Sequence, residues 1–153
     1  MAGCLFSRRA RTGLGATLLL GSIVPAYGMQ LISEDEARLP AAAPKAASRG
    51  GITRGPTINV VSPDSKVQIK PPFAMNVQFR ARGGSKIDPA SVKVTYLKQP
   101  LVDLTPRLKP SISESGITLE RVDVPAGTHD IRIDVTDAEG RTKSEVVTFT
   151  AVK

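Results

Sequence analysis

His129 is the only histidine in the chain, so it is the first residue to consider for chemistry. Histidine serves as a general base or a metal ligand near neutral pH. Asp130 follows it directly, but neighbouring side chains on a strand point to opposite faces, so Asp130 cannot orient the His129 ring. His129 also comes just after a turn, where a polar side chain can anchor the corner between two strands. The pattern therefore favours a structural corner histidine over a catalytic one.

The second group of residues to consider is a set of carboxylates in the same half of the chain: Asp123, Asp130, Asp134, Asp137 and Glu139. Calcium needs about six to eight oxygen ligands from one pocket. Asp130 and Asp134 share a strand face, but Arg132 lies between them and neutralises them. Asp137 already suits the first position of a turn. A weak Ca²⁺ site near Asp137 and Glu139 stays open as an alternative, and no metal or other cofactor is predicted.

Motifs for nucleophilic catalysis are missing from the sequence. It contains no Gly-x-Ser-x-Gly elbow and no Ser-x-x-Lys motif. It also contains no paired cysteine and histidine spacing for zinc and no glycine-rich phosphate loop before a helix. Cys4 is the only cysteine. The sequence therefore predicts a protein that is not an enzyme.

Residues 1–28 have the pattern of a signal peptide. Arg8–Arg11 supplies three positive charges, Leu14–Val24 is an apolar run, and Ala26–Gly28 fits a small-x-small cleavage site. The apolar run is shorter than the roughly 20 residues that span a bilayer. Cleavage after Gly28 would remove Cys4, and an exported domain without disulfides is ordinary in a bacterial periplasm. We therefore expect a periplasmic or secreted protein, and an uncleaved signal anchor is the alternative.

The net charge of the chain is +7, from 21 basic and 14 acidic residues. Removal of the three arginines near the N-terminus leaves 18 basic residues and a net charge of +4. No cluster of Lys and Arg with interleaved aromatic residues occurs, so nucleic-acid binding is not expected.

The segment 29–55 is rich in Ala, Pro and Gly and is predicted to be a flexible tether. Ser33 followed by Glu36 is a helix-capping pattern, and Pro40 ends any such helix after about one turn. A short motif around Leu31 and Ile32 that docks on a partner is the alternative interpretation.

The remaining chain, 56–153, alternates apolar and polar residues in short runs separated by Gly and Pro, which is typical of β-strands. The most regular runs put Phe73, Met75, Val77, Phe79 and Ala81 on one face, and His129, Ile131, Ile133 and Val135 on one face of another strand. Seven strands are predicted, at 57–61, 66–70, 73–82, 92–97, 117–124, 129–136 and 142–152. A turn at 137–140 joins the last two.

Three finer features are also predicted. Thr105 is expected to cap a short helix that begins with Pro106. A change of phase between Leu119 and Val122 indicates a β-bulge. In the last strand, Val147 and Phe149 are expected to face inward.

The run Gly127–Arg141, an early Ser62–Pro63 turn and the segment Ile87–Tyr96 resemble the Ig-like or fibronectin-type-III-like domains of bacterial secreted proteins. The resemblance covers about 56–153. It implies an all-β fold, an Ig-like two-sheet antiparallel β-sandwich of about seven strands with one short helical crossing. The Cys…Trp…Cys pattern of true immunoglobulin domains is absent. Such sandwiches host many unrelated functions, so the resemblance does not specify an activity.

These observations predict a non-catalytic interaction or accessory module of the bacterial cell envelope that binds an unknown envelope protein. The alternative is a binder of envelope or extracellular polysaccharide. Sugar sites usually use exposed rings, whereas Phe73, Phe79, Tyr96 and Phe149 are all assigned to the core. Arg80 and Arg82, with Lys70 and Arg121, could instead contact an anionic polymer.

A protein partner would use an edge strand, because an edge offers unpaired backbone groups. The expected edges are Thr57–Val61 and Thr142–Val152. Val146 and Thr148 are the predicted contact residues on the last strand, beyond the protective charges of Lys143 and Glu145.

Overall fold

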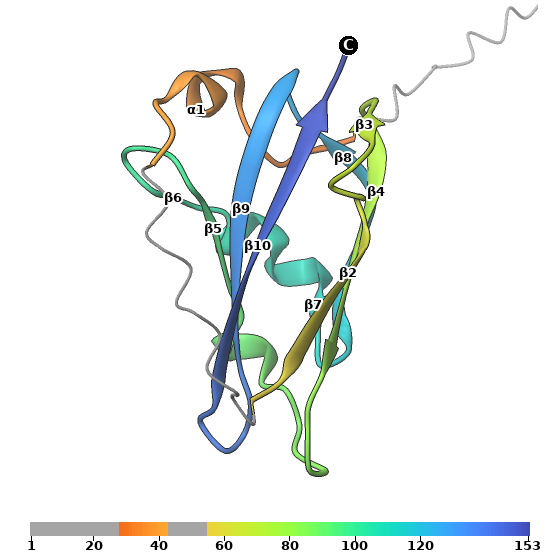
Figure 1. Cartoon of the computed structure of the whole chain (residues 1–153), viewed down its shortest axis with the longest axis vertical. Coiled ribbons are helices and arrows are strands. Elements are labelled where there is room, and N and C mark those ends of the chain that lie inside the picture. Colours follow the sequence, from red (N-terminus) through yellow and green to blue (C-terminus); the bar gives the residue numbers. More distant parts are fainter. Residues whose placement is uncertain (1–27, 43–54) are drawn as a thin grey trace, which may run out of the picture.

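The computed structural model describes residues 28–42 and 55–153. The predicted signal peptide and the segment 43–54 therefore lie outside the described residues, apart from Gly28. In the described part, no helix is both long enough and apolar enough to cross a membrane. The described chain is mostly β-structure, arranged as two five-stranded sheets (Figure 1), so the all-β prediction is confirmed.

The first sheet has the strand order β1-β8-β4-β2, with β7 paired to β8. Its strands are β1 (Met29–Gln30), β2 (Thr57–Ser62), β4 (Phe73–Arg80), β7 (Ile112–Ser113) and β8 (Gly116–Asp123). The second sheet has the order β3-β10-β9-β5-β6. Its strands are β3 (Gln68–Ile69), β5 (Lys93–Tyr96), β6 (Val102–Asp103), β9 (Gly127–Thr136) and β10 (Thr142–Ala151).

The prediction of purely antiparallel sheets is wrong. The strand β1 pairs parallel with β8, and β3 pairs parallel with β10, so both sheets are mixed. The seven expected strands correspond to β2, β3, β4, β5, β8, β9 and β10, and three further strands of two residues each were not expected. These two-residue strands form where a loop passes beside a longer strand. Two residues are too few to show an alternating pattern in the sequence.

The core lies between the two sheets and is built from the predicted inward faces. The side chains of Met75, Val77, Ile131, Ile133 and Val135 are at most 1% exposed. The predicted inward phase is also confirmed for β5 and for the end of β10: Val92, Val94, Tyr96, Val147 and Phe149 are all buried. Alternation therefore identified the buried face of β4, β5, β9 and the end of β10.

The predicted β-bulge in β8 is confirmed. Phe73 of β4 pairs with Val122, and Met75 pairs with Leu119, so three steps along β8 match two along β4. At the start of β8, Gly116 has a φ of +149°, and a Cβ there would lie 2.0 Å from the carbonyl oxygen of Val77. Only glycine lets the two strands approach this closely.

The helical crossing is α2 (Thr105–Leu108), which carries the chain from β6 in the second sheet toward β7 in the first. The prediction that Thr105 caps this helix is wrong. Leu104 is the N-cap residue and makes no side-chain cap bond. The hydroxyl of Thr105 instead accepts a hydrogen bond from the backbone N–H of Val94 at 2.9 Å, while Asp103 accepts from the Thr105 N–H at 2.9 Å. Two 3₁₀ turns complete the helical content of the described residues after β2, at Pro89–Ser91 and Lys109–Ser111.

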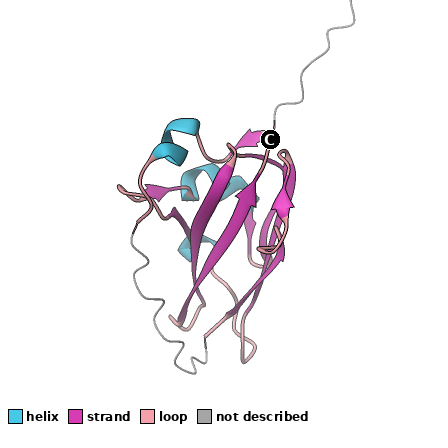
Figure 2. Ribbon diagram, turned by 45° about the horizontal axis from the view of Figure 1, so that its top comes forward, coloured by secondary structure: helices cyan, strands magenta, loops and turns pink. Residues whose placement is uncertain are grey.

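The predicted tether is wrong for its first part. Residues 28–42, which we call the strap, pack along one end of the two sheets (Figure 2). Leu31 and Ile32 are fully buried in the core, so they do not form a motif exposed to a partner. The short helix α1 (Glu34–Arg38) follows, with the predicted capping box between Ser33 and Glu36.

Arg107 of α2 holds the strap in place. Its guanidinium donates to both carboxylate oxygens of Glu36, at 2.7 and 2.8 Å, and to the carbonyl oxygen of Leu31 at 2.7 Å. The hydrogen bond from Arg107 lowers the pKa of Glu36 to about 2. Further along the strap, the N–H of Ala42 donates to the carbonyl of Leu97 at 3.1 Å. The strap therefore connects the end of β8 to the end of β5.

Candidate interaction surface

The strands β2 and β10 form neighbouring open edges of the two sheets. β2 pairs only with β4, and β10 pairs with β3 only at Thr150–Ala151, among the strands that the structure describes. Both strands were the edges predicted from the sequence. A groove of about 350 Å³ runs between them, and we call it the edge groove. It is lined by Val60, Val61, Pro63, Asp64, Ser65, Glu145, Val146, Val147 and Thr148.

Exposed apolar side chains gather at this edge. Among the described residues, the large hydrophobic side chains that remain exposed are Val61 (51%), Val67 (57%), Leu101 (57%) and Val146 (44%). Val61 and Val146 both line the edge groove, and Val67 directly precedes β3, the short strand that pairs with β10. Three of these four side chains therefore belong to one edge of the molecule. Single exposed valines are ordinary on a protein surface, whereas exposed apolar side chains that gather at one edge make that edge the candidate surface.

The two residues predicted as contacts on β10 differ in availability. The Val146 side chain is exposed and its neighbour across the strand pair is Arg132. The Thr148 hydroxyl donates to the carboxylate of Asp130 at 2.6 Å. Thr148 is therefore partly engaged within the sheet, and Val146 is the stronger candidate for contact through its side chain.

Most polar side chains on the outer face of β9 and β10 are hydrogen-bonded to one another. Cross-strand hydrogen bonds join Thr128 to Thr150 at 3.2 Å and Thr136 to Thr142 at 3.2 Å. Asp134 accepts from Ser144 and also pairs with Arg132 at 3.1 Å. Polar groups that are already paired have little to gain from a ligand, so on this face the exposed Val146 side chain, beside the edge groove, is the candidate for contact.

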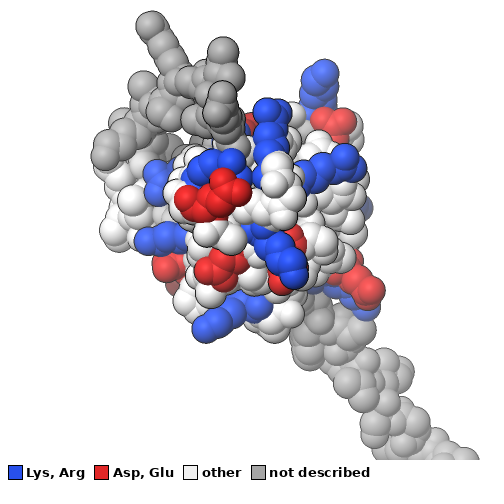
Figure 3. All heavy atoms as spheres, turned by 90° about the horizontal axis from the view of Figure 1, so that it is seen from below, with Lys and Arg blue, Asp and Glu red and all other residues white. Residues whose placement is uncertain are grey.

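Arg80 and Arg82 are both exposed, but the structure does not gather the predicted basic residues into one site. Arg80 ends β4 and lines a groove on the outer face of the first sheet, whereas Lys70 lines a different groove beside the strap. Arg82 lies in the following loop, where its carbonyl accepts from Arg141 at 3.2 Å. Figure 3 shows basic and acidic side chains interleaved over the end of the molecule that is lowest in Figure 1. That end therefore carries no patch of a single sign among the described residues.

His129 is fully buried and makes two hydrogen bonds. Its Nε2 lies 2.8 Å from the carbonyl oxygen of Pro125, and its Nδ1 lies 2.8 Å from the hydroxyl of Tyr96. A carbonyl only accepts, so Nε2 carries the proton and Nδ1 accepts from the Tyr96 hydroxyl. Burial lowers the pKa of His129 and raises the pKa of Tyr96 to about 12, which keeps both groups neutral. These contacts support a structural function at the corner before β9.

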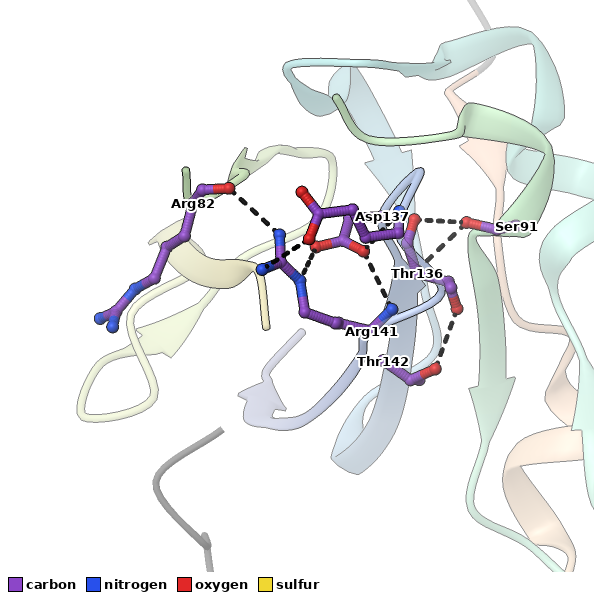
Figure 4. A network of polar contacts seen from close by, with 7 residues as sticks. Arg82, Ser91, Thr136, Asp137, Arg141 and Thr142 are labelled. Atoms are coloured by element: carbon purple, nitrogen blue, oxygen red, sulfur yellow. Dashed lines mark hydrogen bonds and ion pairs between the residues drawn. The ribbon is translucent and has the colours of Figure 1, made fainter. Parts of the chain in front are cut away.

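The turn between β9 and β10 is closed by one buried carboxylate (Figure 4). One oxygen of Asp137 accepts from the backbone N–H groups of Glu139 at 3.0 Å and Arg141 at 2.9 Å, and the other accepts from the Arg141 side chain at 2.7 Å. Burial would raise the pKa of Asp137, but the hydrogen bonds and charge of Arg141 outweigh it and lower that pKa. Asp137 therefore acts as the forward-bonding turn residue that the sequence predicts.

The same arginine bears on the calcium alternative. Arg141 also pairs with Glu139 at 3.0 Å, so both carboxylates of the suggested site already have a cationic partner. In residues 28–42 and 55–153, no three His, Cys, Asp or Glu side chains are grouped as metal ligands. The arrangement is that of a rigid hairpin turn.

The four aromatic residues assigned to the core are all buried: Phe73, Phe79, Tyr96 and Phe149. Phe149 lies against two other rings, with centroid distances of 5.6 Å to Phe73 and 5.4 Å to His129. None of these four rings is available as a platform for a sugar.

Sequence reasoning missed the residues that the β2–β3 turn brings to the edge groove, namely Pro63, Asp64 and Ser65. The available signal was Ser62–Pro63, which marks a turn but not the strand it turns toward. Sequence reasoning also missed Arg107, because its partners Leu31 and Glu36 lie more than 70 positions earlier in the chain.

The comparisons with known proteins give no match. No protein-family model matches the chain, and neither a curated protein nor a solved structure is significantly similar to it. The interpretation of the surface therefore depends on its geometry.

Proposed function

We propose that this chain is an exported, non-catalytic module of the bacterial cell envelope that binds another protein through the edge formed by β2 and β10. The observation that carries the proposal is the cluster of exposed valines along that edge, with Val61 and Val146 in one groove. An open edge supplies backbone hydrogen bonds to a partner, and the apolar side chains supply the buried contact.

The strand order supports an Ig-like fold as part of this proposal. Ig-type sandwiches place the first, second and fifth strands in one sheet and the third, sixth and seventh in the other. The long strands here follow that division, with β2, β4 and β8 together and β5, β9 and β10 together. His129 also occupies the corner at the start of β9, where such domains place a tyrosine that bonds back to the backbone a few residues upstream. Its bond to Pro125, four positions earlier, has the same form.

Export is supported by the position of the predicted cleavage site. The strand β1 begins at Met29, directly after Gly28. A mature chain that starts at Met29 would thus keep all of the strap except Gly28, including the buried Leu31 and Ile32.

Photocrosslinking tests the protein-binding function. A photoreactive residue at Val146 of the exported chain should form adducts with an envelope protein in intact cells. The matched control is the same residue at Thr118, which is exposed on the outer face of the first sheet, away from the edge groove. Adducts from Thr118 but not from Val146 would contradict the proposal.

A second candidate function, polysaccharide binding, has one observation in its favour. The groove on the outer face of the first sheet is lined by Asn76, Gln78, Arg80 and Thr118. The structure records no hydrogen bond or ion pair from these four side chains to any other described residue. Amides and a guanidinium suit the hydroxyl and carboxylate groups of an acidic sugar chain. Retention on purified envelope polysaccharide that is lost in Arg80→Ala, without protein adducts at Val146, would favour this alternative.

A further inference from the structure

The hydrogen bonds around β10 show which of its backbone groups face the open edge. In the antiparallel pair of β9 and β10, the N–H of Asp137 donates to the carbonyl of Arg141 at 3.1 Å. Bonded and non-bonded pairs alternate along such a ladder, so the odd-numbered residues of β10 bond to β9. The N–H and C=O groups of the even-numbered residues consequently point the other way.

Two independent hydrogen bonds agree with this assignment. The N–H of Val152 donates to Ile69 at 2.8 Å, which places an even-numbered residue on the β3 side of β10. On β9, the carbonyl of Asp130 accepts from Leu97 at 2.9 Å, so the even-numbered residues of β9 bond toward β5 and not toward β10. The pairs Asp130–Thr148 and Asp134–Ser144 are then non-bonded pairs, in which side chains lie closest together. Their direct side-chain hydrogen bonds fit that geometry.

The open part of this edge is limited at both ends. At one end, β3 pairs with Thr150 and Ala151. At the other end, Gly55 is buried beside Thr142, so close that a Cβ on Gly55 would lie 3.5 Å from the Thr142 carbonyl oxygen. The even-numbered residues between these limits are Ser144, Val146 and Thr148. Their N–H and C=O groups have no partner strand among the described residues.

We infer that Ser144–Thr148 is a docking site for a short extended segment of a partner protein, which adds as a strand beside β10. This inference rests on the proposed function and specifies the partner's chemistry. The stretch between Thr142 and Thr150 holds seven residues, or roughly 23 Å of strand. A segment of about five to seven residues fits there. A complete edge strand does not, because it would meet β3 at one end and Gly55 at the other.

The chain itself provides a precedent for this mode of binding. The two residues of β3 already add to the same edge of β10, in parallel, and pair with it only briefly. A partner segment would continue the row that β3 begins. The docking site therefore favours a segment from a flexible or extended region of the partner, which can enter and leave the edge over a few residues.

The side chains around Ser144–Thr148 define the sequence that fits. Val61 and Val146 offer apolar contact near its centre. Lys143 and Glu145 lie 3.9 Å apart and are 35% and 44% exposed, so their charges largely balance. A segment with aliphatic residues at alternate positions and no run of like charge matches this surface, whereas a strongly acidic or basic peptide does not.

A phage-displayed library of random heptapeptides, selected on the purified protein, is the probe that tests this inference. We expect enrichment of peptides with alternating aliphatic residues. In hydrogen-exchange NMR, a synthetic copy of an enriched peptide should slow exchange of the Ser144, Val146 and Thr148 amides. The Lys143, Glu145 and Val147 amides bond to β9 and should not change.

Val146→Pro removes one outward donor and should weaken peptide binding at least tenfold, because proline is tolerated where its nitrogen faces away from a sheet. Leu101→Ala removes an exposed apolar side chain elsewhere and is the matched control, with binding unchanged. If Val146→Pro fails to fold, the amide exchange of the unmodified protein with and without peptide still tests whether the peptide binds beside β10. Failure to enrich any peptide, or protection of other amides, would overturn the inference.

Self-association is distinguished in the same experiment. A dimer formed through the same edge would protect the Ser144, Val146 and Thr148 amides in the absence of peptide, more strongly at higher protein concentration, and would also overturn the inference. Failure of the peptide selection together with protein adducts at Val146 would reject the short segment while leaving the proposed function intact. Failure of both experiments would reject both.

Discussion

The two sides of the second sheet differ in how far their backbone groups are hydrogen-bonded to neighbouring segments. At the β5 edge, β6 pairs with Thr95 and Tyr96, and the Val94 N–H and C=O bond to Thr105 and Leu104 at 2.9 Å each. The strap adds a hydrogen bond from Ala42 to Leu97 just beyond the strand. At the β10 edge, the stretch between Thr142 and Thr150 has no such cover among the described residues.

The difference shows that an uncovered edge is not a general property of this fold. Exposed edges invite unwanted pairing, and proteins usually cover or charge them. Here one edge is covered by the short strand β6, by the Thr105 hydroxyl and by a strap that an arginine holds in place. The other edge leaves the N–H and C=O groups of Ser144, Val146 and Thr148 without a partner strand among the described residues and keeps Val146 exposed, which is the arrangement expected where a partner binds. Substitutions at the covered edge should thus reduce stability, and substitutions at the open edge should reduce binding.

The largest effect is expected from proline at Val147. The Val147 N–H bonds toward Ile131 of β9, so Val147→Pro removes a bond inside the sheet and should cost about 3 kcal/mol or more in unfolding free energy. Val146→Pro, one position earlier, should cost much less, because its N–H faces the open edge. Urea denaturation of both variants measures the difference, and equal losses would mean that the assignment of outward-facing residues is incorrect.

His129 should show the next largest effect. His129→Ala should lower the unfolding free energy by about 1–3 kcal/mol, because it removes two buried hydrogen bonds and leaves the Tyr96 hydroxyl without its acceptor. Thermal unfolding measures the loss. If the stability stays the same while binding of a ligand is lost, His129 is a site residue and not a corner residue.

The same histidine predicts a dependence on pH. Burial lowers its pKa in the folded protein, so the unfolded chain binds the proton more readily. Stability should therefore decrease as the pH falls below the ordinary histidine pKa of about 6.5, until the folded form is protonated as well. Melting temperatures measured from pH 8 to pH 5 should show this decrease, and His129→Phe, which cannot titrate, should lack it.

Arg107→Ala should have a moderate effect, about 1–3 kcal/mol, because it removes the charge-assisted bonds that hold the strap. Limited proteolysis should then cut within 28–42 sooner than in the unmodified protein. The matched control is Lys109→Ala, two positions later, because Lys109 is exposed and makes no ion pair with a described residue. Equal resistance of the strap in Arg107→Ala would show that Leu31 and Ile32 alone hold it.

The smallest effect on stability is expected at the open edge. Val146→Thr keeps the backbone donor and replaces an exposed methyl group, so the unfolding free energy should change by less than about 0.5 kcal/mol. Binding of an edge-specific peptide should nevertheless weaken measurably in calorimetric titration. If Val146→Thr lowers the unfolding free energy and leaves the peptide affinity unchanged, the β10 edge contributes to stability and not to binding.

Regular alternation made most of the long strands predictable. In β4 and β9 the side chains are in or out according to their position alone, so the sequence is sufficient to identify the buried face. The register of β10 beside β9 also follows from the turn at Asp137. Alternation does not reveal which backbone groups meet a neighbour, because that depends on the order of strands in the sheet.

The strap could not be predicted, because its apolar residues are few and show no regular alternation. Leu31 and Ile32 stand among charged residues, alanines and prolines, a composition typical of linkers. Their burial depends on space left between the ends of two sheets and on Arg107, far along the chain. The cover of the β5 edge was also unpredictable from local sequence. Thr105 precedes a proline and has the local pattern of a helix cap. Its hydroxyl instead accepts from the Val94 N–H, because β5 lies beside it in the fold.

Under the proposed export, the strap also implies an order of events. The predicted cleavage site lies after Gly28, while pairing with β8 begins at Met29 and the buried core begins at Leu31. A peptidase needs several residues on both sides of the bond extended and free of other partners, and folded backbone resists cleavage until it opens. Removal of the leader should accordingly precede docking of β1, so that folding of this end is held back until the chain has been processed.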